Sequence, residues 1–172
     1  MRRLVFLVAA VAMLALASSP VGAAQNGHRP FHADLTGVMT HEPLPGGPTD
    51  ECPYGVRTHV VVSGTATHLG LTTESSAFCS VMSSPTVPHG EAVFVAANGD
   101  TLTYTFVADC PAAGPPTPGT ILSCTAEGTI TGGTGRFAGA TGVLHNENHV
   151  IFGGIEVAEW PAWESLTGWL RY

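Results

Sequence analysis

The chain has 172 residues and a mass of 17.7 kDa, the size of one ordinary domain. Hydrophobic residues make up 44% of it and charged residues only 11%, a balance that excludes the intrinsically disordered class. Thirteen acidic side chains oppose six arginines and no lysine, so the formal net charge is -7 and nucleic acid is not an expected partner.

The first 24 residues have the pattern of an export signal. Arg2 and Arg3 precede an uncharged apolar stretch, residues 4–17, which is shorter than the about 20 residues that a membrane-spanning helix needs. Small residues follow, so we expect cleavage near Ala23 or Ala24. That length disfavours the alternative, an uncleaved membrane anchor. The sequence therefore predicts a secreted protein with no membrane partner after cleavage.

Most of the mature chain has the composition of β-strands. A proline- and glycine-rich loop, residues 41–53, allows one strand before it. In residues 101–108 apolar side chains alternate with threonines, which is typical of a half-buried strand, and Asn98-Gly99 before it suits a tight hairpin turn. The expected strands lie near residues 31–40, 57–63, 71–82, 92–96, 101–108, 121–131, 143–152 and 166–172.

These short strands predict an all-β fold, either an antiparallel barrel or a sandwich. A barrel has the advantage over a sandwich that it leaves no exposed edge. The expected organisation is a signal peptide over 1–24, a segment with one strand and the loop over 25–53, and the rest of a single barrel domain over 54–172.

All four cysteines lie in the mature part, namely Cys52, Cys79, Cys110 and Cys124. An even number in an exported chain predicts disulfides, with three pairings to choose from. The strand layout favours Cys52 with Cys79 and Cys110 with Cys124, because each pair then staples the open end of a hairpin. No C-x-x-C spacing occurs, so we expect no metal at these cysteines.

A glycine-rich segment, residues 132–142, is the densest motif of the chain. Gly133, Gly135 and Gly139 permit sharp turns around one short helical corner. From this corner Phe137 can plug the end of the core. The neighbouring Arg136 can reach a backbone carbonyl or an acid.

The same segment satisfies a relaxed dinucleotide-binding fingerprint. That fingerprint requires a full helix after the turn, whereas Gly139, Thr141 and Gly142 end any helix within two turns and a strand follows. We therefore expect no dinucleotide site at this segment.

A possible polar cluster occurs in the strand expected at 143–152. His145, Glu147 and His149 alternate along it, so they share one face and could bind a ligand at the barrel mouth, hold a metal or move protons. A solvated outer face is the commoner arrangement. Asn146 and Asn148 on the opposite face are no more apolar, so the pattern leaves open which face lines the interior. The favoured prediction includes no metal.

Two further side chains are candidates for a role. Tyr104 lies on the apolar face of its strand, where its hydroxyl could orient a ligand if that face lines an open cavity. His68 is expected to make a structural hydrogen bond. No G-x-S-x-G elbow occurs, so nucleophilic catalysis has no support.

Three tryptophans gather near the C-terminus, at Trp160, Trp163 and Trp169. A hydrophobic plug at the closing strand is favoured over sugar stacking or a subunit interface. Pro161 and Glu164 predict a loop before residue 166 that would suit a lid over the barrel mouth.

The segment GTITGGTGRFAGATG, followed by a strand, resembles the allene oxide cyclase and dirigent barrel superfamily, most closely its small secreted bacterial members. The segments THLG, AANGD and TGWL look like other landmarks of that group. The resemblance implies an eight-stranded barrel with a central cavity, working without metal or organic cofactor and frequently trimeric in the plant relatives. The plant enzymes control the cyclisation or coupling of a reactive small molecule. Their catalytic side chains lie outside this corner, and none is carried over to a residue here.

Three functions follow as hypotheses. The favoured one is a non-catalytic binding module that takes a small, largely apolar molecule in its cavity. The second is a cofactor-free allene oxide cyclase-like or dirigent-like isomerase or coupling guide, working by shape and a few polar groups. The third, a structural cell-surface protein, predicts a barrel packed solid with side chains.

Overall fold

The computed structural model describes residues 27–50, 52–53, 55–79, 86–111, 115–154 and 156–172, so the predicted signal peptide lies outside the described residues. Eight strands and one short 3-10 turn make up the fold. They are β1 (Arg29–Pro43), β2 (Val56–Ala66), β3 (Gly70–Cys79), β4 (Thr86–Ala96), β5 (Thr101–Asp109), β6 (Ile121–Gly133), η1 (Gly135–Phe137), β7 (Thr141–Ile151) and β8 (Glu159–Arg171).

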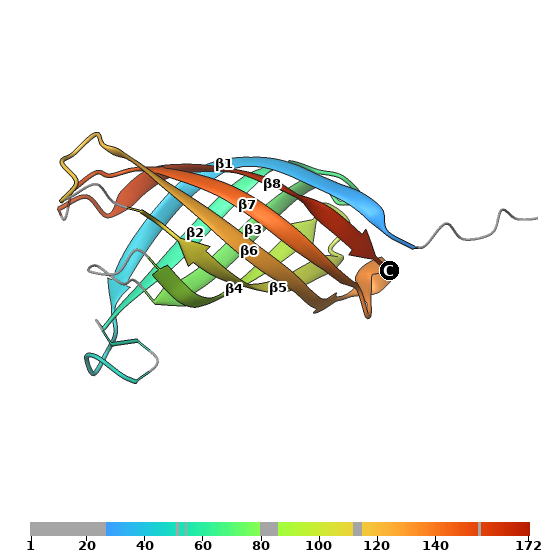
Figure 1. Cartoon of the computed structure of the whole chain (residues 1–172), viewed down its shortest axis with the longest axis horizontal. Helices are drawn as coiled ribbons and strands as arrows, with labels where there is room; N and C mark the ends of the chain where they lie inside the picture. Colours follow the sequence, from blue (N-terminus) through green and yellow to red (C-terminus); the bar gives the residue numbers. More distant parts are fainter. Residues whose placement is uncertain (1–26, 51, 54, 80–85, 112–114, 155) are drawn as a thin grey trace, which may run out of the picture.

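The strands form a closed antiparallel barrel, which confirms the predicted fold class (Figure 1). Each strand pairs with its neighbours in the chain, and β1 also pairs with β8 to close the ring. Outside the irregular stretches, side chains alternate between the interior and the outer surface along the strands. In β5 the alternation is the predicted one, with Leu102 and Tyr104 buried inside. None of the described helical segments has the length and hydrophobicity that crossing a bilayer requires.

The last strand begins earlier than the sequence suggests. β8 starts at Glu159, so the predicted loop and lid before residue 166 are wrong. Pro161 is accommodated because β8 has no β7 partner at this residue. The pairing of β8 with β7 ends one residue later, at Val150 with Ala162. A missing backbone amide is tolerated where a strand has no partner on one side.

The fourth strand also begins earlier, at Thr86 rather than near residue 92. Its first residues pair with β5 alone, and the register between the two strands shifts between Val87 and Gly90. Pro88 lies in this irregular stretch. A bulge of this kind lets a strand contain a proline without losing a central ladder bond.

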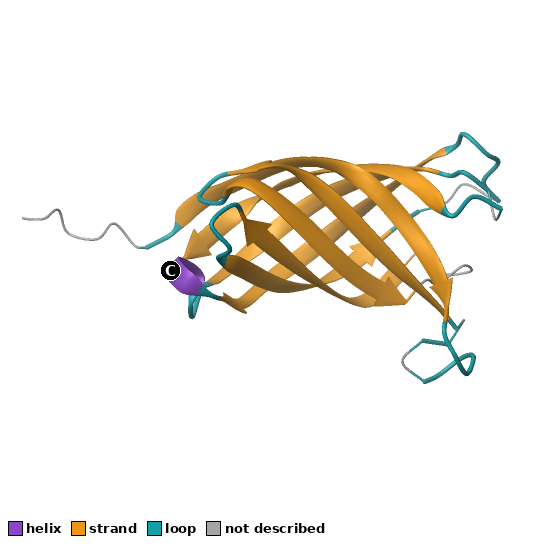
Figure 2. Cartoon of the chain, turned by 180° about the vertical axis from the view of Figure 1, so that it is seen from behind, coloured by secondary structure: helices purple, strands orange, loops and turns teal. Residues whose placement is uncertain are grey.

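One end of the barrel is filled with apolar side chains. Phe31, Phe94, Leu102, Phe137 and Leu170 are at most 3% exposed there. We call these five residues the plug. They include the phenylalanine of the glycine-rich corner, so its predicted place in the core is confirmed. Figure 2 shows the single helical turn at this end, beside the C-terminus.

The corner that carries η1 has the predicted sharp turns. Gly135 has φ = 57° and Gly139 has φ = 74°. At Gly135 a Cβ atom would also overlap the carboxylate of Asp100. The same carboxylate receives Arg136, whose Nε lies 3.5 Å from its Oδ2, so the arginine reaches an acid as expected.

Both predicted disulfides are confirmed, and both lie at the other end of the barrel, where the odd-numbered strands end. Cys52 is bonded to Cys79 at the end of β3, and Cys110 after β5 is bonded to Cys124 in β6. Each pair ties a segment outside the strand ladder to a strand. Disulfides of this kind are typical of proteins of oxidising compartments.

Candidate functional site

A cavity of about 260 Å³ occupies the barrel interior between the plug and the disulfide end. Its wall is mainly apolar, and aromatic rings contribute much of it. It reaches the surface where the exposed Pro111 lines it, so we call this end the mouth. The apolar wall includes Met39, Val60, Phe78, Phe106, Val150 and Trp160.

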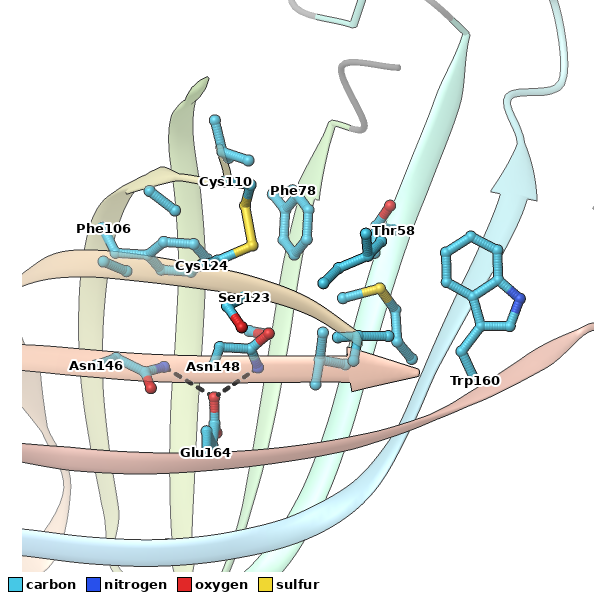
Figure 3. Close-up of a pocket in the computed structure, with 18 of the residues that line it drawn as sticks. Thr58, Phe78, Phe106, Cys110, Ser123, Cys124, Asn146, Asn148, Trp160 and Glu164 are labelled. Carbon is cyan, nitrogen blue, oxygen red and sulfur yellow. Dashed lines mark hydrogen bonds between the residues drawn. A yellow bond between two sulfur atoms is a disulfide. The ribbon is translucent and has the colours of Figure 1, made fainter. Parts of the chain in front are cut away.

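Against this wall stands one cluster of polar side chains from four strands. Glu74 of β3 accepts a hydrogen bond of 2.8 Å at Oε1 from the Tyr104 hydroxyl of β5. Glu164 of β8 accepts two at Oε2, from Asn146 Nδ2 at 2.8 Å and from Asn148 Nδ2 at 3.3 Å. Both asparagines lie on β7, and Figure 3 shows their amides converging on the one carboxylate oxygen. We call Glu74 and Glu164 the acid pair.

The acid pair is almost fully removed from water. Glu74 is 1% exposed and Glu164 is 5% exposed. Burial raises the pKa of Glu74 well above its usual range, and the charge of Glu164 and a hydrogen bond to its carboxyl raise it further. A hydrogen bond between two carboxyl groups requires a proton on one of them. The pair therefore holds a proton at pH values at which exposed glutamates are ionised.

Tyr104 acts as a donor to this pair. Burial raises its pKa well above the usual range, and the charges of Glu74 and Glu164 add to that effect. The hydroxyl therefore keeps its proton. The ring also stacks on Phe94 of the plug with 5.6 Å between centroids, so the polar cluster lies next to the closed end of the barrel.

The opposite part of the cavity contains a histidine and a tryptophan. His41 Nδ1 and Thr58 Oγ1 are hydrogen-bonded at 2.9 Å, and the His41 ring meets Trp160 edge to face at 4.4 Å. Burial lowers the pKa of His41, so its ring is neutral at neutral pH. The indole N–H of Trp160 donates to the carbonyls of Gly154 and Val157, at 3.2 and 3.1 Å.

Tyr104 lines an open cavity, which was the condition for its predicted role in orienting a ligand. The three candidates of β7 lie elsewhere. His145, Glu147 and His149 project from the outer face, so the alternative that puts them at the barrel mouth is wrong. The physical reason is the period of two along a strand: Asn146 and Asn148 fill the inward positions. In the described part of the chain no group of three or more His, Cys, Asp or Glu side chains could hold a metal ion.

The outward candidates have partners on the barrel surface. His145 Nδ1 lies 2.7 Å from Glu127 Oε1. His149 Nδ1 and Ser123 Oγ are hydrogen-bonded at 2.9 Å, and the same ring stacks on Trp163. These contacts make a solvated polar outer face, which is the arrangement that the sequence analysis favoured for these three residues.

The tryptophans do not form the predicted plug. Trp160 is 8% exposed and lies in the cavity wall, at the end opposite the plug. Trp163 is half-buried outside, and Trp169 stacks on His28 at 4.0 Å. His68 makes the expected structural hydrogen bond, with Nε2 donating to the Pro30 carbonyl at 2.9 Å.

Both members of the acid pair were missed by the sequence interpretation. Glu74 stands in a run of threonines and serines, where the side chains on the two faces of the strand look alike. Glu164 lies in the segment for which the sequence predicts a loop, because Pro161 and Glu164 interrupt its apolar pattern. Strict alternation back from the buried Leu166 would have placed Glu164 inside, and that was the one available signal.

No family model matches the chain, and no curated protein sequence matches it. Among solved structures the chain is similar to a dirigent protein, the pterocarpan synthase GePTS1. The identity is 15% and the TM-score is 0.47, over 84% of this chain and 86% of that chain. A similarity this distant carries no information about ligand or activity.

Proposed function

We propose that this protein is a secreted binding module that encloses one small molecule with a largely apolar body inside its barrel. The observation that carries the proposal is the cavity, which combines an apolar wall with one buried polar cluster. Ligand pockets in proteins have this composition: the wall supplies affinity, and a few polar groups fix the orientation of the ligand.

The volume limits the ligand to a small molecule. At about 260 Å³ the cavity lies just below the usual range for small-molecule sites, which begins at about 300 Å³. A purely structural barrel would be packed solid, and this one is solid only at the plug. The two disulfides support an extracellular setting, because such bonds persist in oxidising compartments.

A cofactor-free isomerase or coupling guide is the second candidate, and the acid pair favours it. A buried carboxylic acid that keeps its proton can donate it to a ligand oxygen, while its ionised partner can accept a proton from the ligand. Glu74 and Glu164 line the same cavity, and the raised pKa of Glu74 provides a carboxyl group that keeps its proton. The test is to add the bound molecule, once identified, to freshly purified protein and to look for its conversion. Conversion by the unaltered protein that is lost in Glu74→Gln would distinguish this candidate from simple binding.

Native mass spectrometry of the mature protein, purified from the medium of its host, tests the binding function. We expect a reproducible extra mass that leaves on denaturation, because the apolar cavity retains its ligand. The same spectrum reports the cleavage site and shows whether the chain forms the trimer that the resemblance implies.

Two tryptophan variants of β5 make this test specific to the cavity. Ala108 lines the cavity, so Ala108→Trp fills part of it and should abolish the extra mass. Its neighbour Val107 is 50% exposed on the outside, so Val107→Trp should keep it. A clean polypeptide mass in the unaltered protein, or an extra mass that both variants keep, would contradict the proposal.

A further inference from the structure

Apart from a proton that the two carboxyl groups share, no donor among the described residues reaches three buried acceptor atoms of the polar cluster. They are Glu74 Oε2, Glu164 Oε1 and Asn146 Oδ1. The three side chains are 1%, 5% and 9% exposed, and all of them line the cavity. A buried acceptor without a partner destabilises a protein by about 1 to 3 kcal/mol, so such groups call for an occupant.

The recorded hydrogen bonds of the cluster's donors go to the other carboxylate oxygens. Tyr104 donates to Glu74, and Asn146 and Asn148 donate to Glu164. None of these recorded bonds reaches the three open acceptors, so a ligand that binds there has to supply donors. In the empty protein one proton shared by the acid pair satisfies two of the three open acceptors.

We infer that the cavity binds a primary amine in its ammonium form, with the nitrogen between Glu74 and Glu164 and an apolar body in the cavity. This deepens the proposed function and rests on it. An ammonium group has three N–H donors, which matches the three open acceptors. Its single positive charge replaces that of the shared proton, so the charge of the site is the same before and after binding.

Other ligand classes fit the cluster less well. An anionic group would meet the acid pair with no arginine among the described lining residues, and His41 is neutral. An alcohol has one donor for three acceptors, and a quaternary ammonium has none. The rings of Phe78, Phe106 and Trp160 suit an apolar, preferably aromatic, body.

Binding exchanges one proton for one ammonium ion. The ammonium enters with its own three protons, and the proton shared by the carboxyls leaves to solvent. Among the described residues, the titratable side chains that line the cavity are Glu74, Glu164, Tyr104 and His41. Tyr104 is protonated and His41 neutral at neutral pH, so neither supplies the released proton.

The test compares phenethylamine with phenethyl alcohol by isothermal titration calorimetry, because the two probes share one body and differ in the polar group. We expect the amine to bind at least about tenfold more tightly to the unaltered protein. Titration in two buffers of different ionisation enthalpy should show close to one proton released per amine bound and none for the alcohol.

Two glutamine variants provide the matched comparison. Glu164→Gln removes a charge and an open acceptor from the cluster, so it should weaken amine binding by about tenfold or more and change alcohol binding little. Glu147→Gln makes the same chemical change on the outer face of β7 and should leave both affinities unaltered. Proton release from the unaltered protein remains an independent readout if Glu164→Gln does not fold.

The outcomes separate this inference from the function on which it rests. Equal affinities for the amine and the alcohol, or amine binding without proton release, would overturn the ammonium site and leave the binding module standing. Absence of binding for both probes and for their shorter and longer homologues would overturn both.

Discussion

The acid pair is the feature of single residues that most departs from ordinary packing. Buried carboxyl groups are rare, and two that share one cavity cannot both ionise without a large electrostatic penalty. Glu74 and Glu164 tolerate burial because Tyr104, Asn146 and Asn148 donate to them and because one proton is retained. Barrel closure depends on backbone pairing between the strands and does not need a buried polar cluster. We therefore connect the cluster with a ligand.

The raised pKa of Glu74 predicts how stability depends on pH. The folded protein keeps a proton that the unfolded chain releases above its ordinary pKa of 4.5. The stabilisation from this proton is complete below pH 4.5 and is lost as the pH rises through the raised pKa of the folded state. Glu74→Gln resembles the protonated acid, so its melting temperature should exceed that of the unaltered protein by an amount that grows with pH.

Melting curves from about pH 5 to about pH 9 check this prediction. His41 has a lowered pKa and so acts in the opposite direction, losing stability as the pH falls through its range. That contribution is common to both proteins and cancels in their difference. Glu147→Gln, on the exposed face, serves as the control. A constant difference between Glu74→Gln and the unaltered protein across the range would show that Glu74 does not hold the proton.

At the scale of elements, the corner between β6 and β7 closes one end of the barrel. The turn η1 carries Phe137 into the plug, where the side chain is fully buried and packs against Tyr172 at 4.9 Å. Arg136 and Asp100 tie the corner to the hairpin between β4 and β5. The corner therefore has a structural role, remote from the mouth of the cavity.

Truncation of the plug measures this role. Phe137→Ala removes a fully buried ring, so we expect the free energy of unfolding to fall by about 3 to 5 kcal/mol. Urea denaturation of the disulfide-bonded protein gives the value. An unchanged transition midpoint would show that the ring is not part of the core.

Two glycines of the corner allow a comparison of backbone strain with steric overlap. Gly139 has a positive φ but open space around its missing Cβ, so Gly139→Ala should cost only the left-handed backbone, about 1 to 2 kcal/mol. Gly135 has a positive φ, and its Cβ would also overlap Asp100, so Gly135→Ala should cost more. Equal losses in urea denaturation would mean that Asp100 moves aside without loss of stability.

At the scale of the whole molecule, the barrel divides into a solid end and a hollow end. The plug supplies apolar burial at one end, whereas the strands around the cavity lack a packed interior there. Both disulfides lie at this hollow end, and Cys110 and Cys124 line the cavity itself. They compensate for the missing core by constraining the unfolded chain.

Removal of either disulfide should therefore destabilise the protein. The Cys110–Cys124 pair closes a sequence separation of 14, and its replacement by two serines should cost about 3 kcal/mol. The Cys52–Cys79 pair closes a separation of 27, so the corresponding double variant should cost slightly more. Unfolding free energies of both double variants, measured against the oxidised protein, check the size and the order of the effects.

The sequence by itself determined the features that depend on local patterns. The alternation in β5, the turn at Asn98-Gly99 and the glycines around Phe137 indicated an all-β fold and its corner, and the layout of the strands around the four cysteines favoured the two disulfides that form. Each of these signals lies within a few residues of chain or a single hairpin, where local geometry limits the alternatives.

Only the tertiary structure decided what lines the interior. On β7 both faces are polar, so no local pattern distinguishes Asn146 from His145, and the choice is made when β6 and β8 set the register. The acid pair joins β3 to β8, from opposite parts of the chain, and closure of the barrel alone brings them together. Their burial, the raised pKa of Glu74 and the cavity beside them are consequences of that closure.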